Sequence, residues 1–419
     1  MASDAAAPEP IPSAWELLKR RDFMLYWSTR VASTLGVQIQ SVALGWQMYA
    51  VARETYSIPQ SAFFVGMIGL AAFIPVFLLA LPAGEAADRY ERKKILMLCY
   101  AGEIATALML LAAAFFDFAS IPLLLFLSFL FGCSRAYMGP AGTATAPMLV
   151  PRILLPRAIA WNSLAWQGGS IVGPAIGGLL LSHSTPTAYG TTSALYLVAI
   201  VTLSLIRTNT RPEVQPGSRL QLVKDGLVYV WRNKIVFGAI SLDMVAVLLG
   251  GATALLPVFA RDVLHVGAEG FGLLRAGPGI GATIVAAILA AFPIRRHAGL
   301  TMFAGVFIFG LATVVFGYSR ELWLSVAALA VLGGADMLSV FVRQTLVQIV
   351  TPDPMRGRVA AVSSLFIGAS NELGEFRAGV MSTVLTPIGA VIFGGVGAMV
   401  VTATWAFLFP ALRKADRLE

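Results

Sequence analysis

Two glutamates lie one helical turn apart in a stretch that is otherwise apolar or small, "LFIGASNELGEF" at 365–376. They are Glu372 and Glu375. A carboxylate held away from bulk water loses hydration in its charged form, and can then exchange a proton near neutral pH. We therefore interpret the pair as a candidate for proton coupling, balanced by Arg135 or Arg377. The alternative is a permanent structural ion pair.

Other charged side chains also stand inside apolar stretches. Glu103 and Asp243 are further candidates for coupling or charge pairing, because an ionisable group in hydrocarbon is costly and commonly functional. Arg30 is a candidate contact for an anionic substrate; the alternative is pairing with a nearby acid. A shift of the chain by 201 residues places Asp336 opposite Arg135, which predicts a charge bridge between two related halves.

Residues for enzyme chemistry are sparse. His183, His265 and His297 are far apart in the sequence and lack metal-ligand spacing. No lysine follows a glycine, as a phosphate-binding loop requires. Cys99 and Cys133 stand in apolar stretches and predict no disulfide framework. We expect no metal, no cofactor and no enzymatic activity; a membrane-embedded enzyme or a receptor is the remote alternative.

The composition places these residues in a membrane. Of 419 residues, 58% are hydrophobic and only 12% are charged, and the mean hydropathy is +0.78. Apolar runs of roughly 20 residues match about 30 Å of hydrocarbon, and they predict helices because a backbone in lipid must satisfy its own hydrogen bonds. The predicted fold is an all-α polytopic membrane protein with about twelve spans: 25–50, 61–83, 93–116, 121–147, 161–182, 187–206, 235–259, 270–292, 299–318, 322–350, 358–384 and 387–411.

Lysine and arginine predict the orientation of the chain. They concentrate in the connections on the side of both termini, whereas the opposite connections carry only Arg53, Arg261 and Arg320. This bias predicts a multi-pass inner (plasma) membrane protein with both termini in the cytoplasm and an uncleaved first helix. The net charge of +8 then reflects topology, so we expect no nucleic-acid partner. We expect a monomer in the lipid bilayer.

An internal repeat divides the chain. The 201-residue shift pairs Pro151 with Pro352 and Arg157 with Arg358, and a shift of 203 pairs Arg92 with Arg295. The predicted parts are a tail at 1–24, a first bundle at 25–206, a linker at 207–234, a second bundle at 235–411 and a tail at 412–419. In the linker, a helical face predicts an amphipathic helix on the cytoplasmic leaflet; a linker that merely packs is the alternative. The face comprises Leu220, Val223, Leu227, Val230 and Trp231.

The connection between the second and third predicted spans carries a motif, "GEAADRYERKK" at 84–94. It resembles the loop signature of the major facilitator superfamily, although Glu91 stands where the signature has a second glycine. The resemblance implies a cytoplasmic latch between the two bundles, which breaks when they rock. The alternative is a basic loop that only sets topology. The candidate residues are Gly84, Asp88, Arg89, Arg92 and Lys93.

A second motif, "GSIVGPAIGG" at 169–178, is similar to the pattern of proton-coupled exporters in that superfamily. Three of its glycines share a helix face, which allows a neighbouring helix to approach closely, and its proline invites a bend. We expect a hinge for alternating access. Its residues are Gly169, Gly173, Pro174, Gly177 and Gly178.

The remaining resemblance narrows the family. Arg135 with Gly139 is similar to the superfamily's arginine motif of the fourth span, linked there to proton transfer, with Met138 in place of a polar residue. Stretches 139–163 and 343–376 resemble the branch containing the enterobactin exporter and its drug-efflux relatives. The resemblance implies two pseudo-symmetric six-helix bundles and proton-coupled export of an amphiphilic small molecule, a drug or siderophore-like compound. A lipid or lysolipid flippase and a proton-coupled importer are the alternatives.

Overall fold

The computed structural model describes residues 15–212, 219–292, 294 and 296–415. Arg295, one of the repeat matches, and the ends of both predicted tails lie outside this range. The described chain is helical, and the helices of the first half are α1 (Trp15–Leu18), α2 (Arg21–Arg53), α3 (Ile58–Arg89), α4 (Arg92–Phe115), α5 (Ile121–Thr145), η1 (Ala146–Met148), η2 (Arg152–Leu154), α6 (Leu155–His183) and α7 (Thr185–Ser204).

The second half begins with α8 (Arg219–Arg232), which lies within the predicted linker 207–234. Proline stands in the first turn of many of the long helices, α3, α6, α7 and α14 among them, where its missing N–H is tolerated. The helices after α8 are α9 (Lys234–Gly250), η3 (Ala252–Leu255), α10 (Leu256–Val258), η4 (Phe259–Val263), α11 (Gly267–Ala291), α12 (Ala298–Tyr318), α13 (Leu322–Val350), α14 (Asp353–Leu408) and α15 (Pro410–Arg413).

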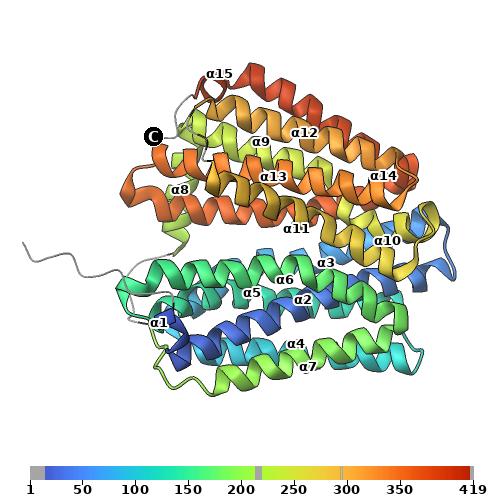
Figure 1. Ribbon diagram of the computed structural model, residues 1–419, viewed down its shortest axis with the longest axis horizontal. Helices are drawn as coiled ribbons and strands as arrows, with labels where there is room; N and C mark the ends of the chain where they lie inside the picture. Colours follow the sequence, from blue (N-terminus) through green and yellow to red (C-terminus); the bar gives the residue numbers. More distant parts are fainter. Residues whose placement is uncertain (1–14, 213–218, 293, 295, 416–419) are drawn as a thin grey trace, which may run out of the picture.

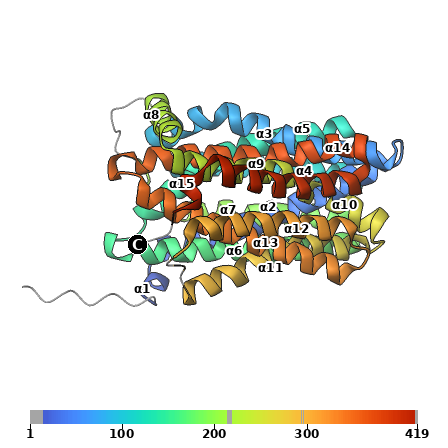
Figure 2. The same cartoon turned by 90° about the horizontal axis from the view of Figure 1, so that it is seen from above.

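The long helices form two bundles that lie side by side (Figure 1). Helices α2 to α7 make the N-terminal bundle, and α9 to α14 make the C-terminal bundle; Figure 2 shows the same elements from above. Helices α1 and α15 lie at one end of the molecule, here called the terminal end, and the turn at 54–57 and segment 259–266 lie at the other, the distal end. The core of the protein is the interior of the two bundles and their contact.

Within the described residues, ten helices are long and apolar enough to cross a membrane. Helix α2 is also long, with 33 residues, but polar residues such as Ser33, Thr34 and Gln38 make it less apolar. Helix α14 runs for 56 residues and is broken at Thr386, whose φ of 66° is not helical, just before Pro387. The break falls between predicted spans 358–384 and 387–411. Twelve spans are consistent with this arrangement.

Predicted span 235–259 is not one helix. Helix α9 ends at Gly250, and the chain continues as the short turns η3 and α10 and the π-helix η4. Gly251 lies against the backbone carbonyl of Gly374, so a side chain there has no room. The end of α9 thus lies at a close approach to α14, which the hydropathy of the segment does not reveal.

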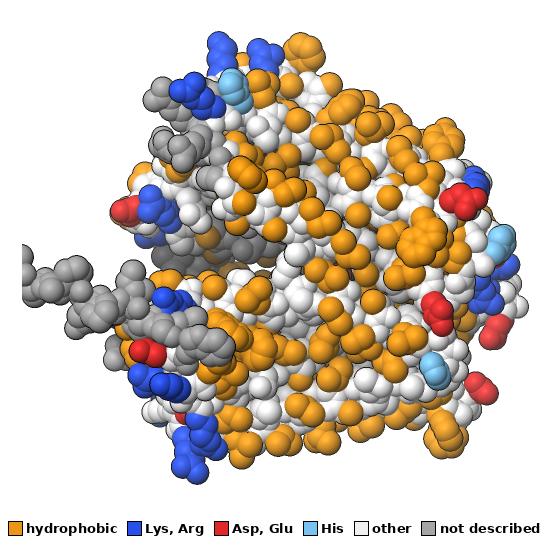
Figure 3. Space-filling view, viewed as in Figure 1, with side chains coloured by type: hydrophobic (Ala, Val, Ile, Leu, Met, Phe, Trp, Pro, Cys, Tyr) orange, Lys and Arg blue, Asp and Glu red, His pale blue; other side chains and the backbone are white. Residues whose placement is uncertain are grey.

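The surface is apolar around its middle. Figure 3 shows hydrophobic side chains over this region, Lys and Arg gathered at the terminal end, and an indentation there between the bundles. Phe407 and Leu98, for example, are 79% and 76% exposed. Large exposed apolar area on a folded chain marks a surface that another apolar phase covers, here the lipid that the composition predicts.

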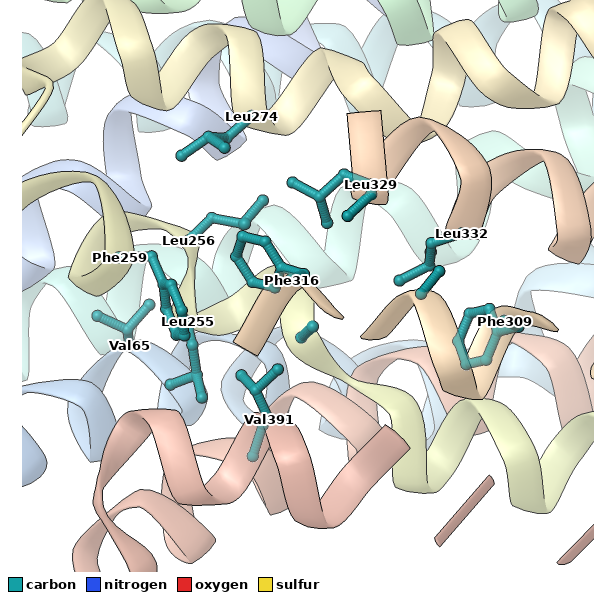
Figure 4. Packing of buried hydrophobic residues seen from close by; sticks show 14 of the residues in the cluster. Val65, Leu255, Leu256, Phe259, Leu274, Phe309, Phe316, Leu329, Leu332 and Val391 are labelled. Carbon is teal, nitrogen blue, oxygen red and sulfur yellow. The ribbon is translucent and has the colours of Figure 1, made fainter. Parts of the chain in front are cut away.

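Toward the distal end, the two bundles share a hydrophobic cluster. Val65 of α3 lies beside Leu255 and Phe259 of the opposite bundle, and Phe316 and Val391 continue the cluster behind them (Figure 4). All five side chains are buried. Between helices in a membrane, contacts of this kind stabilise through close van der Waals packing. The distal contact is therefore held mainly by packing.

Candidate functional site

A cavity of about 390 Å³ lies between the bundles. Residues of α2, α3, α5 and α6 line it from one side, and residues of η3, α10, α11 and α14 line it from the other. Its lining combines charged and polar groups with aromatic rings, among them Arg30, Gln38, Phe131, Arg135, Trp166, Phe271, Arg275, Glu372 and Glu375.

An ion pair crosses the cavity from one bundle to the other. The Arg135 guanidinium of α5 donates to Glu372 Oε1 of α14 at 3.2 Å. Arg135 also lies over the ring of Phe131, 5.6 Å from its centroid. Gly69 of α3 lies against the Glu372 carbonyl, and a Cβ there would stand 3.1 Å from that oxygen. The absence of a side chain at Gly69 therefore lets α14 come close.

The second glutamate has different partners. Thr253 of η3 donates its hydroxyl to Glu375 Oε1 at 3.1 Å, and Arg275 of α11 lies 3.9 Å from the same oxygen. Arg275 also donates to the Thr253 carbonyl at 3.3 Å. These contacts stay inside the C-terminal bundle. Sequence reasoning missed Arg275 and Thr253, although an arginine within an apolar run was a signal for the first.

Two more arginines are predicted contacts of the substrate or of the glutamates. Arg30 lines the cavity, and among the described residues no carboxylate lies within ion-pair distance of it. Arg377 points elsewhere: it donates to the Leu249 carbonyl and lies near the ring of Phe393. Arg135, not Arg377, is therefore the arginine that balances Glu372.

Glu103 of α4 lies outside the cavity, inside the N-terminal bundle. It is fully buried, and neither of its carboxylate oxygens has a hydrogen-bond partner among the described residues. Arg135 is the cation whose charge acts on it. Tyr100 and Cys99 of the same helix and Tyr196 of α7 interact electrostatically with it. A buried carboxylate without a partner is costly when ionised, so this position requires an explanation.

Asp336 does not form the bridge predicted from the repeat. Its carboxylate lines a small cavity with Asp243 inside the C-terminal bundle, and Asp243 lies 3.5 Å from Arg343. Arg135 is bound to Glu372 instead. Asp336 faces the interior of its own bundle, whereas Arg135 faces the cavity between the bundles, so the two matched positions do not meet.

The cations of the latch motif lie at the ends of several helices. Arg92 donates to the Ala87 and Ala144 carbonyls, at 3.1 Å and 2.7 Å, and Lys93 donates to the Ser204 and Ile206 carbonyls, at 2.8 Å and 2.6 Å. The two cations thus bind carbonyls at helix ends within the N-terminal bundle, where the helix dipole favours positive charge.

The other three latch residues lie in α3. Gly84 is buried, Asp88 is partly exposed in the last turn, and Arg89 pairs with Glu85 at 2.8 Å on the exposed surface. The ion pair of Arg89 and Glu85 is local to α3. The contacts of Lys93 and Arg89 thus lie within the N-terminal bundle, and the latch between the bundles stays a prediction.

Asp22 fastens the start of the linker to this bundle. It stands ahead of predicted span 25–50 and accepts hydrogen bonds from the backbone N–H groups of Arg207 and Thr208, at 3.1 Å and 2.8 Å, and from the Thr208 hydroxyl at 2.6 Å. Partial burial works to raise the pKa of Asp22, but these hydrogen bonds and the charge of Arg21 outweigh it and lower the pKa below 3.8.

Replacing Asp22 with Ala is expected to destabilise the protein by about 1–2 kcal/mol at pH 7. Because the folded-state pKa is lowered, this contribution is complete above the unfolded value of 3.8 and is lost as the pH falls through the folded value. Unfolding of both proteins in detergent, followed at pH 7 and below pH 3.8, measures the difference. An equal difference at both pH values would show that the carboxylate charge is not involved.

The glycine motif of α6 faces two neighbours. Gly169, Gly173 and Gly177 lie against Thr34, Gln38 and Val42 of α2, in the same bundle. Pro174 and Gly178 lie at the contact with the other bundle: a Cβ on Gly178 would stand 2.6 Å from the Gly272 Cα of α11, and the Pro174 carbonyl lies against Gly272. The motif thus joins a tight contact inside one bundle to a tight contact between bundles.

A second glycine contact repeats the arrangement on the other side of the interface. A Cβ on Gly66 of α3 would stand 2.9 Å from the Gly379 Cα of α14. Near the distal end, the Tyr49 hydroxyl also donates to Asp262, and Trp46 stacks on Phe271 with ring centroids 5.6 Å apart. The two bundles are therefore closely joined at this end.

The sequence as a whole matches one family. A family model described as transmembrane secretion effector matches residues 12–419. The chain belongs to the transmembrane secretion effector family. The chain is 26% identical over 404 residues to the enterobactin exporter EntS of Citrobacter koseri, a match that covers 94% of the chain and 92% of the relative. The enterobactin exporter EntS of Escherichia coli matches with the same identity and coverage.

Solved structures show the same fold. The chain superposes on the POT family transporter PepTSo with a TM-score of 0.74 at 12% identity, covering 94% of this chain and 98% of the other. A D-xylose-proton symporter gives 0.71 at 13% identity with the same coverage. A bacterial homologue of the human lysosomal transporter Spinster, in an inward-facing and unoccupied conformation, gives 0.65 at 16% identity, with 97% of each chain covered.

These findings confirm the superfamily that the motifs predicted. The chain is a membrane transporter of the major facilitator type and not an enzyme. In the described part of the chain, no group of three or more His, Cys, Asp or Glu is arranged to hold a metal ion.

Proposed function

We propose that the protein exports an amphiphilic small molecule, siderophore-like or drug-like, in exchange for protons by alternating access. The observation that carries this proposal is the Arg135–Glu372 pair, which spans the cavity between the bundles. A pair that crosses the interface at the cargo site can link protonation, cargo binding and movement of the bundles. The enterobactin exporters among its relatives support a siderophore-like cargo.

The lining of the cavity suits such a cargo. Phe131, Trp166 and Phe271 offer flat apolar surface, and Arg30 and Gln38 offer donors. Pockets for small molecules combine a mostly apolar lining with a few well-placed polar groups. Arg30, which has no carboxylate partner in the described chain, is the group we assign to an acidic or catechol-like oxygen of the cargo.

The conformation fits the half of the transport cycle in which the distal end is closed and the cavity is open at the terminal end. The bundles meet through Gly178, Gly272, Gly66 and Gly379 and separate at the terminal end (Figure 3). We propose that the protein lies in the inner membrane with both termini in the cytoplasm. The separation of the bundles at the terminal end then opens the cavity to the cytoplasm. We further propose that the protein works as a monomer.

Proton coupling then follows from an exchange of partners by Arg135. In this conformation Arg135 binds Glu372, and Glu103 is buried without a partner. We propose that cargo in the cavity draws Arg135 away from Glu372 and that Arg135 then turns to Glu103. The bundles, no longer tied across the cavity, can then part at the distal end, where cargo leaves and Glu372 takes a proton from outside. After the distal end closes again, Glu372 gives this proton to the cytoplasm and Arg135 returns to it, so one proton enters for each cargo exported. A ligand shifts such an equilibrium only through its difference in affinity for the two states, and the cargo and the proton provide that difference at the Arg135–Glu372 pair.

Replacing Glu103 with Gln is expected to remove the second partner of Arg135 and to favour the distal-closed state about tenfold, the equivalent of one charge-assisted hydrogen bond. Distances between spin labels on the two bundles, measured at pH 6 and pH 8, report the distribution. Tyr196→Phe is the matched control, because it changes a neighbouring hydroxyl and no charge. If the Gln variant opens with pH as the wild type does, the exchange does not occur.

The function itself is tested in inverted membrane vesicles, where acidification of the interior should drive accumulation of cargo. Enterobactin and a cationic dye are the two probes. Uptake that a protonophore abolishes supports proton-coupled export. Movement in the opposite direction would identify an importer, and movement of a labelled lysolipid without either probe would identify a flippase.

A further inference from the structure

Helix α8 divides its apolar residues between two environments. Val230 is buried against Val236 and Val359 of the C-terminal bundle, whereas Leu227, Val228 and Trp231 are 40%, 45% and 75% exposed. The linker thus contains a helix, as predicted, with one apolar side chain packed and others exposed; the side chain of Leu220 lies outside the described residues. An exposed tryptophan and two exposed aliphatic side chains on one short helix require a covering phase.

A pocket of about 600 Å³ opens beside these residues, between α8 and the start of α14. Lys224, Arg232 and Arg358 give it positive charge, and Tyr229 and Asn233 add polar groups. Arg358 is neutralised by Asp225 at 2.8 Å. Among the described residues, neither Lys224 nor Arg232 has a carboxylate within ion-pair distance. The pocket therefore presents two uncompensated cations next to exposed apolar surface.

We infer that this pocket binds the head group of an anionic phospholipid. Lys224 and Arg232 would receive the phosphate, and the acyl chains would run along Val228, Leu227 and Trp231. Each basic side chain near an anionic leaflet adds favourable binding, and tryptophan favours the membrane–water interface. A free phosphate would use the two cations but would leave the apolar residues uncovered, so lipid is the better match.

A lipid in this pocket would affect the contact between α8 and α14. Gly226 lies against the backbone of Arg358, where a Cβ would stand 2.7 Å from its carbonyl oxygen, and Asp225 holds the Arg358 side chain. Met355 and Arg358 of α14 line the same pocket as Lys224 and Arg232 of α8, so a lipid in the pocket would contact both α8 and α14, the helix that carries Glu372. The inference depends on the protein spanning a membrane and is independent of the proposed cargo and of proton coupling.

The test compares lipid retention by the purified full-length protein. The wild type, Lys224→Gln/Arg232→Gln and the control Lys234→Gln/Arg356→Gln are delipidated and titrated with phosphatidylglycerol or phosphatidylcholine, and bound lipid is counted by native mass spectrometry. The control removes the same charge from nearby residues that do not line the pocket. We expect about 10- to 30-fold weaker phosphatidylglycerol binding in the pocket variant, with the control and phosphatidylcholine unchanged.

Two outcomes would overturn the inference. Equal phosphatidylglycerol binding by the wild type and the pocket variant would show that the pocket is not the lipid site. Competition by inorganic phosphate at the same concentration as phosphatidylglycerol would show that the pocket binds anions without requiring a lipid. If the pocket variant does not fold, a photoactivatable phosphatidylglycerol is used on the wild type. The label must then appear on the peptide 219–234, and its absence there would equally overturn the inference.

Discussion

Replacing Glu372 with Gln is expected to reduce proton-driven transport about 10- to 100-fold while the protein still folds and inserts. The amide cannot be protonated, and it loses the charge-assisted hydrogen bond from Arg135 (3.2 Å), a contact of about 1.5–3 kcal/mol. The tie across the cavity is then weak at every pH, so a proton gradient no longer distinguishes its two states. Acidification-driven uptake in inverted vesicles, per unit of inserted protein, measures the loss.

Glu375→Gln is the matched control, because Glu375 lies one turn away on the same helix and bonds to Thr253 within its own bundle. We expect a loss of only a few fold, since no contact between the bundles is removed. A larger loss for Glu375→Gln than for Glu372→Gln would transfer the coupling role to Glu375 and Arg275. An unchanged rate for both would leave coupling to other carboxylates, such as Asp243 or Asp336.

Replacing Gly178 with Leu is expected to prevent closure of the distal end and to abolish transport. The Cβ alone would stand 2.6 Å from the Gly272 Cα and 2.7 Å from the Ala268 carbonyl oxygen, and backbone atoms cannot move aside as the end of a side chain can. Overpacking costs about 1–3 kcal/mol in a well-packed core, which shifts the two states about 10- to 100-fold toward distal opening.

Spin labels at Thr55→Cys and Glu269→Cys, exposed near the distal end on opposite bundles, follow this shift as a longer distance. Gly168→Leu on the same helix is the control, because a Cβ at Gly168 has no atom within 4 Å. A closed distal end in the Gly178 variant would mean that the helices can slide past each other, and the glycine contact would not be the gate.

The sequence was sufficient for the overall fold. Apolar runs of the right length predicted the helices, and the gap between residues 384 and 387 predicted the break that Thr386 and Pro387 make in α14. It was not sufficient where a helix end depends on a distant neighbour. Next to the end of α9, Gly251 lies against the Gly374 carbonyl, which is far away in the chain, so a local pattern carries no sign of this contact.

The charged residues of the candidate site were predicted from the sequence, but their partners were not, because the partners are distant in the chain. A charge in an apolar run is visible in one dimension, and this identified Arg135, Glu372, Glu375 and Glu103. Which of these charged side chains form pairs depends on how the helices are arranged in space. The bond from Arg135 to Glu372, the enclosure of Asp336 with Asp243, and the bonds of Lys93 to carbonyls of its own bundle depend on helix rotation, which the repeat does not specify.

The two close contacts between the bundles, Gly178 with Gly272 and Gly66 with Gly379, are made by backbone atoms. Contacts of this kind are indifferent to the identity of the side chains that line the cavity some turns away. Changes at Trp166 or Phe131 can therefore alter what the protein carries without altering how it closes. Relatives with the same fold are then free to diverge in cargo by substitution of a few cavity residues, while the motion that moves the cargo is inherited unchanged.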